Sequence, residues 1–122
     1  MTKPAPFLPL IGALAIAPLE ASAADLPAGK QYFAANCAAC HSTTRGVNQI
    51  GPSLSGLIGR KSGLAPGFNF SAALRAANIR WTNATLDSWL RRPTNDVHST
   101  RMMISVPSEM DRQNLIAYLR TL

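Results

Sequence analysis

The sequence has only two cysteines, Cys37 and Cys40, and only two histidines among its 122 residues. A zinc site built on the cysteine pair would need a second pair of ligands, and a redox dithiol is expected beside a βαβ pattern. Neither accompanies the pair in this chain. No alternating apolar pattern predicts a strand, and no internal repeat or low-complexity tract is present. These absences favour one small all-α domain and leave another chemistry for the cysteines.

Acidic residues are scarce: six Asp and Glu stand against twelve Lys and Arg, which gives a formal net charge of +6. No basic run is interleaved with aromatic residues, so the sequence gives no indication of a nucleic-acid surface. A basic protein usually meets acidic partners. We therefore expect partner proteins with acidic docking surfaces and no nucleic acid.

The sequence also lacks an apolar run long enough to span a bilayer. Its apolar run, Phe7 to Ala17, follows Lys3 and precedes the small residues Ala21-Ser22-Ala23. This pattern predicts a cleavable secretory signal peptide over residues 1–23, with an uncleaved anchor as the alternative. The remaining residues, 24–122, form one domain for which we expect export to the periplasm and no stable membrane insertion.

The stretch Cys37-Ala38-Ala39-Cys40-His41 is the main chemical motif. A Cys-x-x-Cys-His run is typical of c-type haem attachment. Positions i and i+3 of a helical turn share one face, so both thiols can reach the two vinyl groups on one haem edge. His41 then reaches the iron as the proximal ligand. Export agrees with this interpretation, and we predict one covalent haem c with thioether bonds rather than a disulfide.

Four helical segments are predicted, and helix-breaking residues separate them. They run from Pro27 to Asn36, from Ser71 to Ala77, from a Thr82 or Asn83 cap to just before Pro93, and onward from the capping-box-like Ser108-x-x-Asp111. In the last segment one apolar stripe contains Leu115, Ile116, Leu119 and Leu122. We expect this stripe to pack on the first helix near Gly29 and Phe33. Gly29 costs about 1 kcal/mol inside a helix, which a close helix crossing or a simple helix start would explain.

Two irregular stretches connect these helices, Ser42 to Phe70 and Pro93 to Pro107. The first holds six of the eight glycines. So much loop is unusual in a compact domain unless a cofactor fills its centre. Gly51-Pro52 follows His41 closely enough for the chain to return beneath the imidazole. The Pro52 carbonyl is a candidate acceptor for the second ring N–H of His41, although a simple turn proline is the alternative.

The other axial position of the iron decides the function. A thioether ligand raises the reduction potential and blocks small ligands, whereas an open position favours binding or catalysis. The candidates are Met102, Met103, Met110 and His98. Met110 is expected to pack in the core from the last helix, and His98 would give a bis-histidine centre. Spacing alone does not choose between Met102 and Met103.

Taken together, these residues resemble the class I c-type cytochromes, close to mitochondrial cytochrome c and bacterial cytochrome c2. The resemblance is carried by Gly29-Lys30-x-x-Phe33, the Cys37–His41 motif, Gly51-Pro52-x-Leu54-x-Gly56-Leu57-x-Gly59-Arg60-Lys61, Thr100-Arg101-Met102 and Leu115-Ile116-Ala117-Tyr118-Leu119. It implies the cytochrome c fold, with four or five short helices and large loops around one haem. It also implies His41/Met102 ligation and a Pro52 carbonyl that holds His41. Arg60 and Trp81 would lie near a haem propionate.

Three residues depart from the family pattern. Phe70 replaces a tyrosine that faces a propionate, and Leu74 replaces an asparagine that holds a buried water. Trp89 matches the tyrosine beside the ligand methionine, and its indole can donate a hydrogen bond but not accept one. These departures predict a drier pocket with fewer hydrogen bonds.

The resemblance implies a soluble, monomeric, periplasmic one-electron carrier of a respiratory chain, not an enzyme. A haem peroxidase or gas-binding cytochrome with a labile sixth ligand is one alternative, and a cytochrome subunit of a dehydrogenase complex is another. The lysines that usually ring the haem edge are missing. Their charge is expected instead from Arg45, Lys61, Arg91, Arg92 and Arg101.

Overall fold

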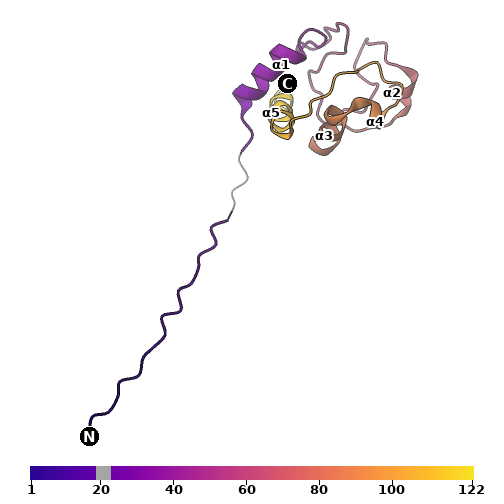
Figure 1. Cartoon of the computed structure of the whole chain (residues 1–122). Coiled ribbons are helices and arrows are strands. Elements are labelled where there is room, and N and C mark those ends of the chain that lie inside the picture. Colours follow the sequence, from indigo (N-terminus) through magenta and orange to yellow (C-terminus); the bar gives the residue numbers. More distant parts are fainter. Residues whose placement is uncertain (19–22) are drawn as a thin grey trace.

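The computed structural model describes residues 1–18 and 23–122, and the regular elements within these ranges are short helices joined by long loops (Figure 1). The helices are α1 (Leu26–Asn36), α2 (Ala72–Ala76), α3 (Asn83–Arg91), α4 (Pro93–Asp96) and α5 (Glu109–Leu119). Over the described ranges, extended pairing is confined to one isolated bridge between Lys61 and Arg80. The all-α fold with large loops is therefore confirmed.

Residues 1–18 form no helix and extend away from the helical domain (Figure 1). The predicted cleavage signal at Ala21-Ser22-Ala23 lies largely outside the described residues. Across the described part of the chain, no helix has both the length and the apolar character needed to cross a bilayer.

The crossing of α1 and α5 joins the two ends of the domain. Gly29 is buried where the helices meet, and a Cβ atom there would overlap the backbone carbonyl of Asn114. The close crossing, rather than a simple helix start, therefore explains this glycine. Asn114 also accepts a hydrogen bond from the backbone N–H of Asp25 at 2.8 Å. One turn further along each helix, Phe33 and Tyr118 contact with ring centroids 5.6 Å apart.

Helix α3 packs beside α5 and begins at a complete capping box. The Thr82 hydroxyl accepts from the backbone N–H of Thr85, and the Thr85 hydroxyl accepts from that of Thr82. The helix ends at Arg91, before Pro93 as predicted. Pro93 then opens the short helix α4, where an irregular stretch was expected. The reason is that proline is well suited to the first position of a helix, which needs no N–H donor.

Two expectations for the last helix are wrong. Met110 does lie in α5, but it is 71% exposed instead of packing in the core. It precedes Leu115 by five positions, which is about 140° around the helix, and Leu115 faces the core with 1% exposure. Leu122 lies beyond the helix end at Leu119, and its carbonyl accepts a backbone hydrogen bond from Gly56.

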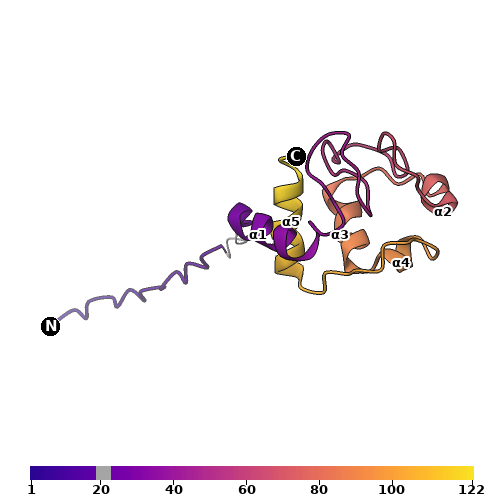
Figure 2. The ribbon, with the colours of Figure 1, turned by 90° about the horizontal axis from the view of Figure 1, so that it is seen from above.

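Viewed from above, α1 and α5 lie at one side of the domain, and α2 and α4 lie at the other (Figure 2). The long loop after α1 is tied together by side chains. Asn48 donates to the Pro66 carbonyl at 3.0 Å and accepts from the Ser53 N–H at 2.9 Å. These hydrogen bonds give the loop a defined conformation although it has no regular secondary structure.

We expect Gly29→Ala to lower the free energy of unfolding by about 2 kcal/mol, because overpacking at the crossing outweighs the gain in helix propensity. Lys30→Ala, on the exposed face of the same helix, is the matched control and should change stability by less than about 0.5 kcal/mol. Guanidinium unfolding of the haem-loaded proteins measures both. Equal stabilities would contradict the close crossing.

Candidate haem site

A cavity of about 500 Å³ opens between the long loop and the helices. Its volume lies within the range of ordinary cofactor pockets, and its lining is mostly apolar. Residues that were predicted for the site and line the cavity are Cys37, Cys40, His41, Pro52, Arg60, Trp81, Trp89 and Met102. The fold thus brings together side chains that lie far apart in the sequence.

The cysteine pair and His41 continue α1 by one further turn. Cys37 ends the helix, and its carbonyl accepts from the backbone N–H groups of Cys40 and His41 at 3.0 and 2.9 Å. Burial, and secondarily the neighbouring Cys40, raises the pKa of Cys37 to about 11. Because a redox-active dithiol needs a lowered thiol pKa, this environment argues against a dithiol-exchange site.

His41 is held from the side of the long loop. Its Nδ1–H donates to the Pro52 carbonyl at 2.8 Å, which confirms the predicted acceptor. Nε2 is therefore the ring nitrogen that remains available to a metal. A Cβ atom on Gly51 would overlap the imidazole ring, so glycine lets the loop pass directly against it. Burial lowers the pKa of His41, against the opposing effect of the Pro52 bond. The neutral imidazole that a metal requires is therefore favoured.

The methionine candidates are clearly separated. Met102 is half-buried, and the Trp89 indole Nε1–H points to its sulfur, with Nε1 and Sδ 3.3 Å apart. Met103 lies at the mouth of the cavity and is 74% exposed. His98 is exposed and does not line the cavity. Met102 is thus the candidate that the fold directs inward.

The remaining walls are apolar or basic. Arg60 is half-buried and donates to the carbonyls of Ser53 and Ser55, both at 3.1 Å, and burial lowers its pKa. Trp81 is buried edge-on against Trp89 with ring centroids 5.3 Å apart. Phe70 and Leu74 also line the cavity with apolar side chains. Within the described part of the chain, no acidic residue lines the cavity.

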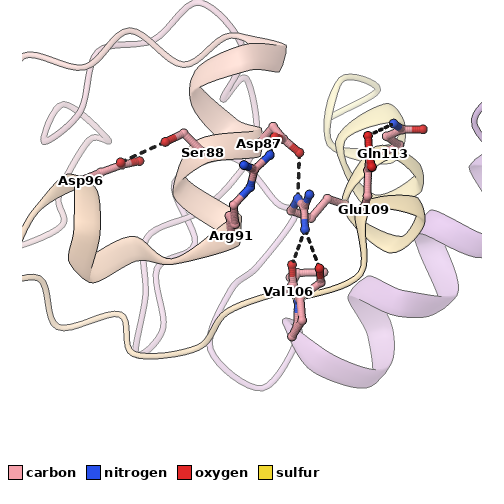
Figure 3. A network of polar contacts seen from close by, with 9 residues as sticks. Asp87, Ser88, Arg91, Asp96, Val106, Glu109 and Gln113 are labelled. Carbon is pink, nitrogen blue, oxygen red and sulfur yellow. Dashed lines mark hydrogen bonds and ion pairs between the residues drawn. The ribbon is translucent and has the colours of Figure 1, made fainter.

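An ion pair outside the cavity, between a buried arginine and a partly exposed aspartate, was not predicted from the sequence. Arg112 of α5 is 4% exposed and donates from Nε to Asp87 Oδ1 of α3 at 2.8 Å (Figure 3). Its signal is present in the sequence, because Arg112 precedes Leu115, Ile116 and Leu119 by three, four and seven residues. A charged residue on an apolar stripe indicates a buried charge that needs a partner.

These residues suit a haem. The turn Cys37–His41 brings two thiols to the cavity, and His41 keeps its Nε2 available. Met102 directs its sulfur inward from another wall. Over residues 1–18 and 23–122, no group of three or more His, Cys, Asp or Glu side chains is placed to hold a bare metal ion. An all-α domain with a Cys-x-x-Cys-His turn at the edge of such a cavity has the features of a c-type haem protein.

Comparisons with known proteins point to the same kind of haem protein. The family model described as cytochrome c matches residues 26–122. Cytochrome c of Euglena viridis is 38% identical over 99 residues, which cover 80% of this chain and 97% of that protein. Cytochrome c2 of Rhodopila globiformis is 40% identical over 95 residues, covering 77% and 90%. The structure of cytochrome cH from Methylobacterium extorquens superimposes with a TM-score of 0.74 at 37% identity, covering 80% of this chain and 99% of that one. The chain belongs to the cytochrome c family, as a class I c-type cytochrome.

The Asp87 carboxylate gives a pH-dependent prediction. The hydrogen bond from Arg112 lowers the pKa of Asp87, and the charges of Arg112 and Arg91 add to this effect against partial burial. The ion pair therefore stabilises the fold fully above the unfolded-state pKa of about 3.9, and this contribution is lost as pH falls through the lower folded pKa.

We expect Asp87→Asn to cost about 1 kcal/mol at pH 7, since the pair is partly exposed. The difference from wild type should shrink steadily below about pH 4 as the wild-type carboxylate takes up a proton. Asp96→Asn is the control, because Asp96 accepts a hydrogen bond from Ser88 rather than from an arginine. Denaturant unfolding at several pH values measures the difference. A cost that did not change with pH would contradict the assignment.

Proposed function

We propose that this protein is a periplasmic one-electron carrier with one haem c, attached through Cys37 and Cys40 and ligated by His41 and Met102. The observation that carries the proposal is that all four side chains line the same cavity. The bound haem would supply an iron that alternates between ferric and ferrous states. We further propose that residues 1–23 are a signal peptide and that residues 24–122 act as a monomer without enzymatic activity.

On the proximal side, the chain's task is to hold the imidazole. The bond from Nδ1–H to the Pro52 carbonyl fixes the tautomer and increases the basicity of Nε2. Gly51 against the ring face limits its rotation. A ligand fixed in this way would not need to move when the iron changes charge, which keeps the structural cost of electron transfer low.

On the distal side, Trp89 directs the thioether. Its N–H occupies one lone pair of the Met102 sulfur, and the other lone pair remains for a metal. A hydrogen bond to an axial ligand draws electron density from it, which favours the reduced iron and raises the potential. Arg60 and Trp81 are the proposed partners of a propionate, since Arg60 brings a positive charge to the cavity wall.

The mouth of the cavity is the proposed docking surface. Ile50, Met103 and Ile104 line it and are more than half exposed, with the basic residues Lys61 and Arg101 beside them. Arg91 instead forms an ion pair with Asp87, and Arg45 and Arg92 lie away from the lining. A partner would be a redox protein that offers an apolar patch with carboxylates around it.

We expect ferric wild-type protein, exported together with haem-attachment machinery, to show the weak far-red absorption of a methionine–iron bond. Met102→Ala should abolish this band, and Met103→Ala, the neighbouring control, should retain it. Absence of the band in wild type, with ready binding of cyanide or carbon monoxide, would instead support a peroxidase or gas-binding protein. Stable co-purification with a dehydrogenase would support the subunit alternative.

Electron transfer from an acidic redox partner should slow as ionic strength rises, because attraction between exposed charges is screened beyond about 8–10 Å at 0.1–0.15 M salt. Lys61→Gln should lower the bimolecular rate constant and weaken its dependence on salt. Arg120→Gln, an exposed charge that does not line the cavity, is the control. Stopped-flow reduction measures both, and salt-independent rates would refute the basic docking surface.

A further inference from the structure

The Arg112 guanidinium connects three parts of the chain. Besides the bond to Asp87, it donates from one terminal nitrogen to the carbonyls of Val106 and Pro107, at 3.0 and 2.8 Å (Figure 3). Burying a charge is costly unless it is paired and hydrogen-bonded. Here, within the described ranges, no buried side-chain nitrogen or oxygen lacks a partner.

The partners of Arg112 lie next to the residues that direct Met102. Val106 follows Met102 by four residues, lines the cavity, and donates its N–H to the Leu90 carbonyl at 2.7 Å. Asp87 precedes Trp89, the donor to the Met102 sulfur, by two residues on the same helix. One buried charge therefore ties the chain after the thioether to the helix that carries its hydrogen-bond donor.

Arg91 provides a natural comparison. It binds the other oxygen of the Asp87 carboxylate at 2.7 Å, but its side chain is 64% exposed and both partners belong to α3. An exposed pair of this kind contributes little. Of the two arginines that bind Asp87, Arg112 therefore joins α5 to α3, whereas Arg91 binds within α3.

We propose that Arg112 is a positioning residue for the sixth ligand. It holds the 102–107 segment against α3, so the Met102 sulfur stays where Trp89 can direct it. The inference rests on the proposed function, in which Met102 is that ligand. When the guanidinium is removed, the segment gains freedom, the thioether leaves its position more often, and an added ligand competes for the vacated position more readily.

The test is the rate at which imidazole binds to the ferric haem-loaded protein, together with the far-red band and the reduction potential. We expect Arg112→Gln to bind about tenfold faster, the factor that corresponds to the loss of a hydrogen bond to a charged group. Its far-red band should be weaker and its potential lower. Arg91→Gln should match wild type in all three measurements.

A merely structural role is tested by Ile116→Val, a buried α5 change that costs about 1 kcal/mol and lies outside the haem cavity. It should leave imidazole binding unchanged at the same temperature. If Arg112→Gln does not fold, Asp87→Asn should still accelerate binding severalfold, because it removes the negative charge that pairs with the guanidinium. Where Arg112→Gln does fold, Arg112→Lys, which keeps the positive charge, should restore part of the wild-type rate.

The outcomes separate the two proposals. A wild-type protein without the far-red band would overturn the proposed function and this inference with it. A normal wild-type band, with Arg112→Gln or Asp87→Asn binding imidazole no faster than Ile116→Val, would overturn the inference alone. Faster binding confined to the Arg112 and Asp87 variants would establish the positioning role.

Discussion

The fold depends on a cavity that the chain cannot fill with its own side chains. Protein interiors normally contain few voids larger than a water molecule, yet this domain leaves a cavity of about 500 Å³ open between the long loop and the helices. Without a group in it, the mostly apolar walls of the cavity would face water and contribute no apolar burial. The net stability of a typical domain is only about 5–15 kcal/mol, so the proposed haem would stabilise the fold as well as supply its chemistry.

The two sides of the cavity are built differently. On the histidine side, His41, Gly51 and Pro52 lie within eleven residues of one another, and one backbone carbonyl fixes the ring. On the methionine side, the loop, α3 and α5 are joined by long-range contacts, which include the hydrogen bond from Trp89, the bond from the Val106 N–H to the Leu90 carbonyl and the bonds of Arg112. Local contacts close at a smaller entropic cost than distant ones. The methionine side is therefore the side from which we expect an axial ligand to be lost.

Sequence reasoning succeeded where the physics is local or shows a period. The cap at Ser108 and the stop before Pro93 follow from short patterns, and Thr82 was one of two predicted caps for its helix. Short patterns left open whether Gly29 marks a close crossing and whether the Pro52 carbonyl holds His41, and the resemblance implied both. It failed where the burial or the hydrogen bonds of a residue depend on partners that are distant in the sequence. A single position on a helix does not reveal whether its face is covered, so Met110 was assigned to the core. Asn48 and Arg112 have polar partners in the loop or on another helix. The place of Arg112 on the apolar stripe indicates a buried charge, but no local rule identifies the partners of either residue.

The proposed docking surface combines two forces that act at different stages of an encounter. Lys61 and Arg101 act through the solvent over about a Debye length, so they change how often partners meet and in which orientation. Ile50, Met103 and Ile104 act only on contact, by releasing water from apolar surface. Three exposed side chains bury too little area for a lasting complex of standard size. Such a surface would favour fast association and early release, which suits the proposed one-electron carrier.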